Sequence, residues 1–233
     1  MHEKSLKTAK EWLSSPYDKI TQEKVKALIE EGGEELIESF YKELDFGTGG
    51  MRGIMGVGPN RINKYTIGKA TQGLANTLIS THEDQDVSVA IAFDCRNNSN
   101  KLALNVAEVL TANGIKAYLF NSLRPTPELS FAVRELGCKG GVVITASHNP
   151  KEYNGFKVYG ADGAQIVNPF DAELINKVRA LSIDEVNFNA NKELIFGLGD
   201  EMDNTYLARL KTISLSPEAI IKQKDLPIVF TGI

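Results

Sequence analysis

Five consecutive segments in the middle of the chain alternate between two hydrophobic patterns, and this alternation constrains the fold more than any other feature. Apolar, mostly β-branched residues dominate Val87–Asp94, Ile115–Phe120 and Gly141–Ser147, which is typical of strands buried on both faces. Segments with helical spacing, Ser99–Gly114 and Pro125–Gly137, separate them. This order predicts an α/β fold in which a mainly parallel mixed sheet lies between helices, an α/β/α arrangement.

The residues at the segment ends predict where the elements begin and end. We expect Ser99 to cap the first of these helices and Gly114 to terminate it. A tight turn at Asn154–Gly155 is expected to lead into a fourth strand, Gly155–Gly160.

The flanking segments set the expected domain boundaries. Residues 1–45 have apolar residues at helical spacing and are expected to form a helical extension packed on domain I. Domain I is expected over residues 46–190, with a further helix at Thr66–Ser80. Residues 191–233 are expected to form linker helices and the start of a second domain, because the final DLPIVFTGI is typical of a strand that has just begun. We therefore expect the amino-terminal part of a longer protein.

Composition excludes several classes of partner. The formal net charge is −4, so the chain lacks the basic balance expected of a protein that binds nucleic acid or anionic membranes. No run of about 18 apolar residues predicts a membrane span. Cys95 and Cys138 have neither zinc-site nor disulfide-framework spacing. These features favour a cytoplasmic protein, and they leave the oligomeric state open.

The segment Thr145–Ile166, TASHNPKEYNGFKVYGADGAQI, carries the residues most typical of chemistry. Ser147, His148 and Asn149 follow a strand, at the edge where open α/β sheets bind ligands. Adjacent residues on an extended chain point in opposite directions, so we expect His148 to contact substrate rather than to act as the base for Ser147. No G-x-S-x-G pattern surrounds the serine, which disfavours a serine hydrolase.

A glycine-rich stretch, FGTGGMRGIMGVGPNRIN, occupies Phe46–Asn63. It is not a dinucleotide fingerprint, because Arg52 takes the place of the third glycine, and it lacks the G-K-S/T of a P-loop. One interpretation is a turn without a ligand. The other is a phosphate cradle in which Thr48, Gly49 and Arg52 bind oxygens.

Taken together, four motifs resemble the α-D-phosphohexomutase superfamily, which includes phosphoglucomutases, phosphomannomutases and related phosphopentomutases. TASHNP followed by NGFK resembles its active-site serine loop, and FGTGGMRGIMG resembles its amino-terminal signature. AFDCRNNS and RPTPELSFAV resemble two further segments in the expected order. The resemblance covers Phe46–Ile166.

This resemblance implies an intramolecular phosphotransferase of the isomerase class. Ser147 would act as a phosphoserine that moves phosphate between C1 and C6 of a hexose phosphate through a sugar 1,6-bisphosphate. Arg52 would stabilise the phosphoryl oxygens, and Lys157 would take the proton of the attacking hydroxyl. His148, Asn149 and Lys157 would contact substrate or phosphate, and an ion pair between Asp94 and Arg96 would support the loop.

The resemblance also implies Mg²⁺, with Ser147 as one ligand. The superfamily's D-x-D-x-D-R metal loop is absent from these 233 residues, so the remaining ligands are expected beyond Ile233 and the isolated chain is expected to be inactive. Two alternatives stay open: a phosphopentomutase-type enzyme, and a non-catalytic phosphosugar-binding protein.

Overall fold

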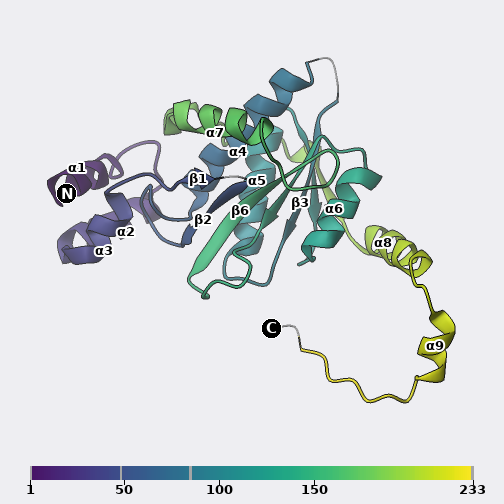
Figure 1. Cartoon of the computed structure of the whole chain (residues 1–233). Helices are drawn as coiled ribbons and strands as arrows, with labels where there is room; N and C mark the ends of the chain where they lie inside the picture. The colour runs from purple at the N-terminus through teal and green to yellow at the C-terminus, as the bar shows by residue number, and fades with distance from the viewer. Residues whose placement is uncertain (1, 48, 84–85, 232–233) are drawn as a thin grey trace. The chain divides into compact units, whose positions relative to one another are not determined.

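Figure 1 shows the computed structural model, which describes residues 2–47, 49–83 and 86–231. The chain divides into two units, Met1–Gly199 and Asp200–Ile233. The first unit contains the strands β1 (Phe46–Gly47), β2 (Gly50–Ile54), β3 (Ser88–Phe93), β4 (Lys116–Phe120), β5 (Gly140–Ile144), β6 (Tyr153–Gly160) and β7 (Ile195–Leu198). Its helices are α1 (His2–Glu11), α2 (Lys19–Glu31), α3 (Gly33–Phe40), α4 (Lys64–Thr81), α5 (Ser99–Ala112), α6 (Thr126–Glu135) and α7 (Phe170–Ala180).

All seven strands form one sheet in the order β1-β2-β6-β5-β3-β4-β7. The strands β5, β3, β4 and β7 run parallel, whereas β6 is antiparallel to both β5 and β2, and β2 is antiparallel to β1. The predicted α/β class with a mixed sheet between helices is confirmed. The sequence did not reveal β1, β2 or β7, because glycines and short length hide their alternation.

Helices cover both faces of this sheet. Along β5, Val142 and Ile144 belong to the main core, which they share with apolar residues of α4, α5 and α7. A Cβ on Gly141, which points to the opposite face, would lie 2.6 Å from Val133 of α6. The α4–α5 layer and α6 therefore lie on opposite sides, as the α/β/α arrangement requires.

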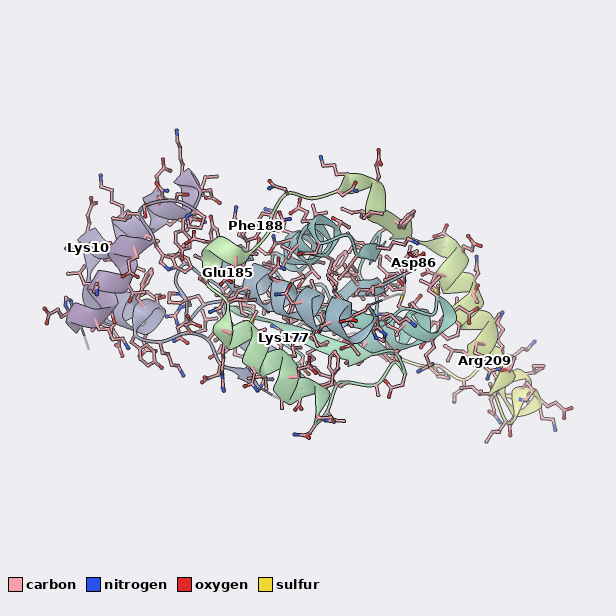
Figure 2. All side chains as sticks on the ribbon, turned by 90° about the horizontal axis from the view of Figure 1, so that it is seen from above. Lys10, Asp86, Lys177, Glu185, Phe188 and Arg209 are labelled. Atoms are coloured by element: carbon pink, nitrogen blue, oxygen red, sulfur yellow. The ribbon has the colours of Figure 1, made fainter. Side chains whose placement is uncertain are left out.

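The helix α7, which the sequence analysis did not predict, packs beside α4. A Cβ on Gly73 of α4 would lie 2.4 Å from a methyl carbon of Val178 in α7, so the two helices approach closely at this glycine. Lys177, labelled on α7 in Figure 2, donates to the carbonyl oxygen of Asn76 in α4 at 3.3 Å.

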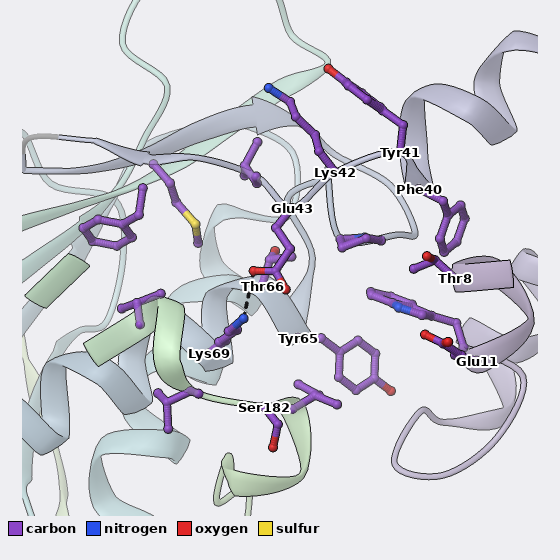
Figure 3. A pocket seen from close by; sticks show the side chains of 18 of the residues that line it. Thr8, Glu11, Phe40, Tyr41, Lys42, Glu43, Tyr65, Thr66, Lys69 and Ser182 are labelled. Atoms are coloured by element: carbon purple, nitrogen blue, oxygen red, sulfur yellow. Dashed lines mark hydrogen bonds and ion pairs between the residues drawn. The ribbon is translucent and has the colours of Figure 1, made fainter. Parts of the chain in front are cut away.

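The first three helices pack around an aromatic cluster of their own. Trp12 stacks on Tyr17 with ring centroids 4.2 Å apart, and both rings contact Tyr65 at the start of α4. A cavity of about 330 Å³ lies where this cluster meets the α/β layers. Figure 3 shows this cavity, with an ion pair of 2.9 Å between Lys69 and Glu43 in its wall.

Two predictions about single elements are wrong. Ser99 does not cap α5, because Asn98 is the N-cap residue and Ser99 already lies inside the helix. The strand expected at the end of the chain does not form, since residues 225–231 adopt neither helix nor strand. The second unit instead contains α8 (Asp200–Thr212) and α9 (Pro217–Lys222). The expected domain boundaries stay a prediction. In the described part of the chain, no helix is both long and apolar enough to cross a bilayer.

We expect Asp18 to make stability depend on pH. Partial burial favours the neutral acid, but the hydrogen bonds from Lys64 and Thr21 outweigh it and hold the pKa of Asp18 well below its usual range. A depressed pKa stabilises the fold above the unfolded-state value of about 3.9, and this contribution declines as pH falls toward the folded pKa. Asn is also a good N-cap residue, so Asp18→Asn removes the charge and keeps the cap of α2.

We therefore expect Asp18→Asn to lower the free energy of unfolding by about 1 kcal/mol near pH 7, a modest value because both side chains are partly exposed. The difference from the unsubstituted chain should shrink near about pH 2.5. Urea unfolding at both pH values measures it, with Asp86→Asn in an exposed ion pair as the control. A difference that does not change with pH would contradict this assignment.

Candidate functional site

The serine loop, residues 145–152, joins β5 to β6 at the carboxyl end of β5, as predicted. Pairing of the two strands extends into it, since the N–H of Thr145 donates to the carbonyl of Gly155 at 3.1 Å. Two tight turns follow, closed by hydrogen bonds from Asn149 to Ala146 (3.1 Å) and from Tyr153 to Pro150 (3.0 Å). The loop is thus a compact double turn in which Ser147 and His148 are exposed.

Ser147 has an unusual backbone conformation. Its φ is 56°, in the left-handed region that residues other than glycine rarely occupy. The hydroxyl oxygen of Thr145 accepts the Ser147 N–H at 2.9 Å and helps to hold this conformation. Backbone strain of this kind persists only where surrounding contacts enforce it, and it clusters at functional sites.

The left-handed conformation of Ser147 also corrects our expectation about His148. On an extended chain the adjacent side chains of Ser147 and His148 would point apart. Because Ser147 is not extended, its Oγ lies 3.3 Å from Nδ1 of His148, and the two side chains interact. The predicted contact of His148 with substrate stays a prediction.

Arg96, in the loop after β3, holds the serine loop by its backbone. One terminal nitrogen donates to the carbonyl oxygens of Ser147 (2.7 Å) and Asn149 (2.6 Å). The other donates to those of Pro150 (2.9 Å) and Tyr153 (3.2 Å). A guanidinium group presents five donors in a rigid plane, so a single side chain can satisfy several carbonyls at once.

A polar network whose far members, Ser99 and Asn154, are buried holds Arg96 in turn. Its Nε lies 3.4 Å from a carboxylate oxygen of Asp94, which confirms the predicted ion pair. The other oxygen of Asp94 accepts from the hydroxyl of Ser99 (2.8 Å), and Ser99 accepts from the amide of Asn154 (2.9 Å). Asn154 is fully buried inside β6, so the turn expected at that position is wrong. The role of Asn154 was not predicted from the sequence, although the D-x-R-x-x-S segment contains two of the hydrogen-bond partners of Asn154.

Arg52 and Lys157 lie on one face of the sheet. Arg52 pairs with Gly155 across β2 and β6, and Lys157 pairs with Gly50 in the same ladder. Directly opposite residues of antiparallel strands share a face, as do residues two apart along a strand, so the two cations are diagonal neighbours. Thr145 extends the row of Arg52 and Gly155 toward the serine loop. The sheet therefore brings two of the predicted phosphate-binding residues to the base of that loop.

Both pairing partners of these cations have to be glycine. A Cβ on Gly155 would lie 2.7 Å from the carbonyl oxygens of both Met51 and Thr145. A Cβ on Gly50 would lie 1.9 Å from the carbonyl oxygen of Phe156. The glycines therefore let the neighbouring backbones approach closely beside each cation.

The two cations suit an anionic ligand. Within the described residues, no ion pair or side-chain hydrogen bond is found for Arg52 or Lys157, so their charges are available to a phosphate. Gly49 lies beside β6, where its carbonyl accepts the Val158 N–H at 2.8 Å. Thr48, the other predicted member of the phosphate cradle, lies outside the described residues. The roles assigned to these residues stay predictions.

Two further features bear on ligands. Oδ1 of Asn149 is buried and has no hydrogen-bond partner, so this predicted contact residue has a free acceptor inside the loop.

No group of three or more His, Cys, Asp or Glu side chains that could hold a metal ion lies in the described part of the chain. Magnesium requires several oxygen ligands, and Ser147 alone does not make such a site. The residues present therefore do not fit Mg²⁺ by themselves.

Known proteins contain closely similar sequences. The family model described as phosphoglucomutase/phosphomannomutase, alpha/beta/alpha domain I, matches residues 43–184. A phosphoglucomutase of Staphylococcus haemolyticus is 40% identical over 201 residues, and one of Staphylococcus saprophyticus is 37% identical over 229 residues. These matches cover 84% and 90% of this chain but only 36% and 40% of the relatives. The chain thus spans little more than a third of their length.

Solved structures give the same result for the fold. A protein of Thermus thermophilus, provisionally described as a phosphomannomutase, matches with a TM-score of 0.60 and 26% identity over 73% of this chain and 36% of its own. A phosphoglucomutase/phosphomannomutase family protein of Burkholderia thailandensis matches with a TM-score of 0.53 and 22% identity. That match covers 70% of this chain and 34% of its own, and it supports the fold alone.

We expect Arg96→Lys to loosen the serine loop while the fold persists. A lysine has one ammonium group and cannot bridge four carbonyls in the plane of a guanidinium group. Losing charge-assisted hydrogen bonds worth about 2 kcal/mol should speed amide hydrogen exchange in residues 145–153 by roughly tenfold or more. Mass spectrometry of the peptides measures this, with Arg134→Lys on exposed α6 as the matched control. Unchanged exchange in that segment would rule out the role we assign to Arg96.

Proposed function

Because the chain belongs to the phosphoglucomutase/phosphomannomutase family, we propose that Ser147 carries a phosphoryl group and exchanges it with a hexose phosphate. The observation that carries this proposal is the exposed serine hydroxyl, held in a strained conformation by Arg96 at the end of β5. A hydroxyl needed only for local hydrogen bonding has no reason to occupy a left-handed position that favours glycine. The reaction would move phosphate between C1 and C6 of the sugar.

Each half-reaction conserves bonds and protons. The P–O bond to Ser147 Oγ breaks as an oxygen of the sugar hydroxyl forms a new bond to phosphorus, giving a sugar 1,6-bisphosphate. Lys157 takes the proton of that hydroxyl and then passes it through solvent to Ser147 Oγ, so the serine hydroxyl reforms and Lys157 is again a free base. The bisphosphate then reorients, and Ser147 takes back the phosphoryl group from the other carbon.

The cations would stabilise the transferring group. Phosphoryl transfer depends mainly on positioning and on neutralising the charge of the equatorial oxygens. Arg52 is cationic throughout, and its diagonal neighbour Lys157 becomes cationic once it has taken the proton of the attacking hydroxyl. Neither has an ion pair with a described residue, which supports this assignment. His148, next to Ser147 Oγ, would bind an oxygen of the substrate phosphate. Any magnesium would need ligands from outside the described residues, and no step here passes through it.

The preferred sugar is proposed to be glucose. The two Staphylococcus relatives are named phosphoglucomutases, which favours glucose phosphates over mannose or pentose phosphates. Transfer to this chain is a proposal, because the chain spans only about a third of those proteins.

Replacing Ser147 by alanine should abolish transfer. In the intact protein, conversion of glucose 1-phosphate to glucose 6-phosphate should fall by roughly a thousandfold or more, as expected for loss of a nucleophile. The assay contains Mg²⁺ and a trace of glucose 1,6-bisphosphate, and Ser214→Ala, at an exposed serine of the second unit, is the control. Phosphopeptide mapping should find phosphate on residues 145–152 only when Ser147 is present.

The opposite outcome has a clear meaning. If the intact protein turns over no glucose, mannose or pentose phosphate and carries no phosphate on Ser147, a phosphosugar-binding protein without catalysis becomes the better interpretation. Labelling of Ser147 by a serine-reactive phosphonate, with hydrolysis of esters, would instead revive the serine hydrolase.

Lys157→Met should separate catalysis from binding. Removing a general base lowers kcat by roughly a hundredfold to ten-thousandfold, whereas removing only a phosphate contact raises KM. Steady-state kinetics of the intact protein measure both constants, and Lys139→Met, at the start of the neighbouring strand β5, is the matched control. A change confined to KM would exclude Lys157 as the base and leave it as a substrate contact.

A further inference from the structure

A second cavity lies on the other side of the sheet from Arg52 and Lys157. Its volume is about 520 Å³, and it lies among α2, the segment from Met55 to Tyr65, and α5. The helix α5 packs against the main core on one face of the sheet. Lys157 and Val143 lie on the other face, which α6 covers. The polar lining of the cavity includes Lys24, Lys64, Asn98, Lys101, Asn105 and Glu108. None of these residues belongs to the candidate catalytic site.

One face of α5 supplies most of the polar groups. Asn98, Lys101, Asn105 and Glu108 follow one another at spacings of three and four residues, so they lie in a row along the helix. Lys101 lies in the first turn of α5, and Asn105 and Glu108 follow one and two turns later. The row therefore runs from a cation toward two oxygen acceptors.

Asn105 is the residue that points to a ligand. It is only 7% exposed, lines the cavity, and its Oδ1 is buried without a hydrogen-bond partner. A buried acceptor without a donor costs about 1–3 kcal/mol. A hydroxyl donor of a bound molecule would satisfy it.

The charges favour an anion at the Lys101 end of this row. Lys64 is paired with Asp18 at 2.6 Å. Lys24 and Lys101 have no ion pair with any described residue, and both line the cavity. Glu108 lies two turns away from Lys101 and can accept a further hydroxyl.

The apolar walls set the size of the ligand. Trp12, Met55, Ile62 and Leu102 also line the cavity. A volume of this size with apolar walls and a few convergent polar groups is typical of a small-molecule site. A lone hydrated ion would leave these walls unfilled.

We propose that this cavity binds a small phosphorylated metabolite that carries hydroxyl groups. Its phosphate lies against Lys24 and Lys101, and its hydroxyls donate to Asn105 and Glu108. This inference does not depend on phosphoryl transfer by Ser147, because none of the groups that bind the ligand takes part in that reaction.

The cavity also contacts the backbone that supports the serine loop. Met55, in its wall, donates its N–H to the carbonyl of Glu152 in that loop at 2.8 Å. The amide of Asn98 contacts the sulfur of Met55 at 3.8 Å. An occupant therefore touches residues one hydrogen bond away from the serine loop, so binding here can alter the loop without contacting Ser147.

Trp12 offers a direct test, because it is the only tryptophan of the 233-residue chain and it lines the cavity. Titration with glucose 6-phosphate should change its fluorescence with saturation. Inorganic phosphate should compete at roughly tenfold or higher concentration, since it lacks the hydroxyl contacts, and glucose alone should produce no change. Saturation by glucose as well as by glucose 6-phosphate would overturn the assignment of an anion site.

Substitutions locate the response. Lys101→Gln, at an exposed position, and Asn105→Leu, of similar volume, should each weaken binding by roughly tenfold. Lys26→Gln, two residues from Lys24 and outside the cavity, is the matched control. Ser147→Ala should keep the full response, which separates this site from the proposed catalytic one.

Either of two results overturns the proposal: no saturable fluorescence change, or a change that Lys101→Gln leaves as strong as before. Because Lys101 is exposed, its substitution does not threaten folding and the test stands even if Asn105→Leu fails to fold.

Discussion

The serine loop depends on the hydrogen bonds that the guanidinium group of Arg96 donates to its backbone. The two terminal nitrogens of Arg96 donate to three carbonyl oxygens of the loop and to that of Tyr153, the first residue of β6, and Asp94 pairs with its Nε. Because Asp94 is also tied through Ser99 to Asn154, the loop, the end of β3 and the start of β6 form one polar unit. A left-handed serine can persist in this setting, since relaxing its backbone would require several charge-assisted hydrogen bonds to break together.

The direction of β6 matters as much as the loop that precedes it. A loop of eight residues is too short for a parallel crossover, so β6 runs antiparallel to β5. On its other side β6 pairs with β2, so it lies between β5 and β2. The β1–β2 hairpin then adds Arg52 to the same face as Lys157, although more than a hundred residues separate them in the sequence. Glycines opposite both cations let the backbones approach closely. Both halves of the sheet contribute to the main core, and the antiparallel half also carries Arg52 and Lys157.

The sequence predicted the parts of the fold that depend on long hydrophobic runs: strands β3, β4 and β5, the helices between them, and the order of the motifs. It failed where local signals conflict with tertiary context. Glycines in β2 hid a strand whose partners require them, and Asn154–Gly155, typical of a turn, lies inside β6 because Asn154 finds buried partners. Ser99 donates to Asp94 instead of capping α5. The candidate site residues were predicted from motifs, but the contact between Ser147 and His148 depends on a backbone angle that no spacing rule supplies.

The left-handed backbone at Ser147 has an evolutionary consequence. At this position backbone energetics alone favour glycine, so the serine sits there against the local conformational preference. If Ser147 carries the phosphoryl group as proposed, a serine-to-glycine change, reachable by a single nucleotide substitution from some serine codons, would relieve strain while deleting the proposed nucleophile. Such an allele would keep its fold, and screens that score only expression or melting temperature would classify it as neutral.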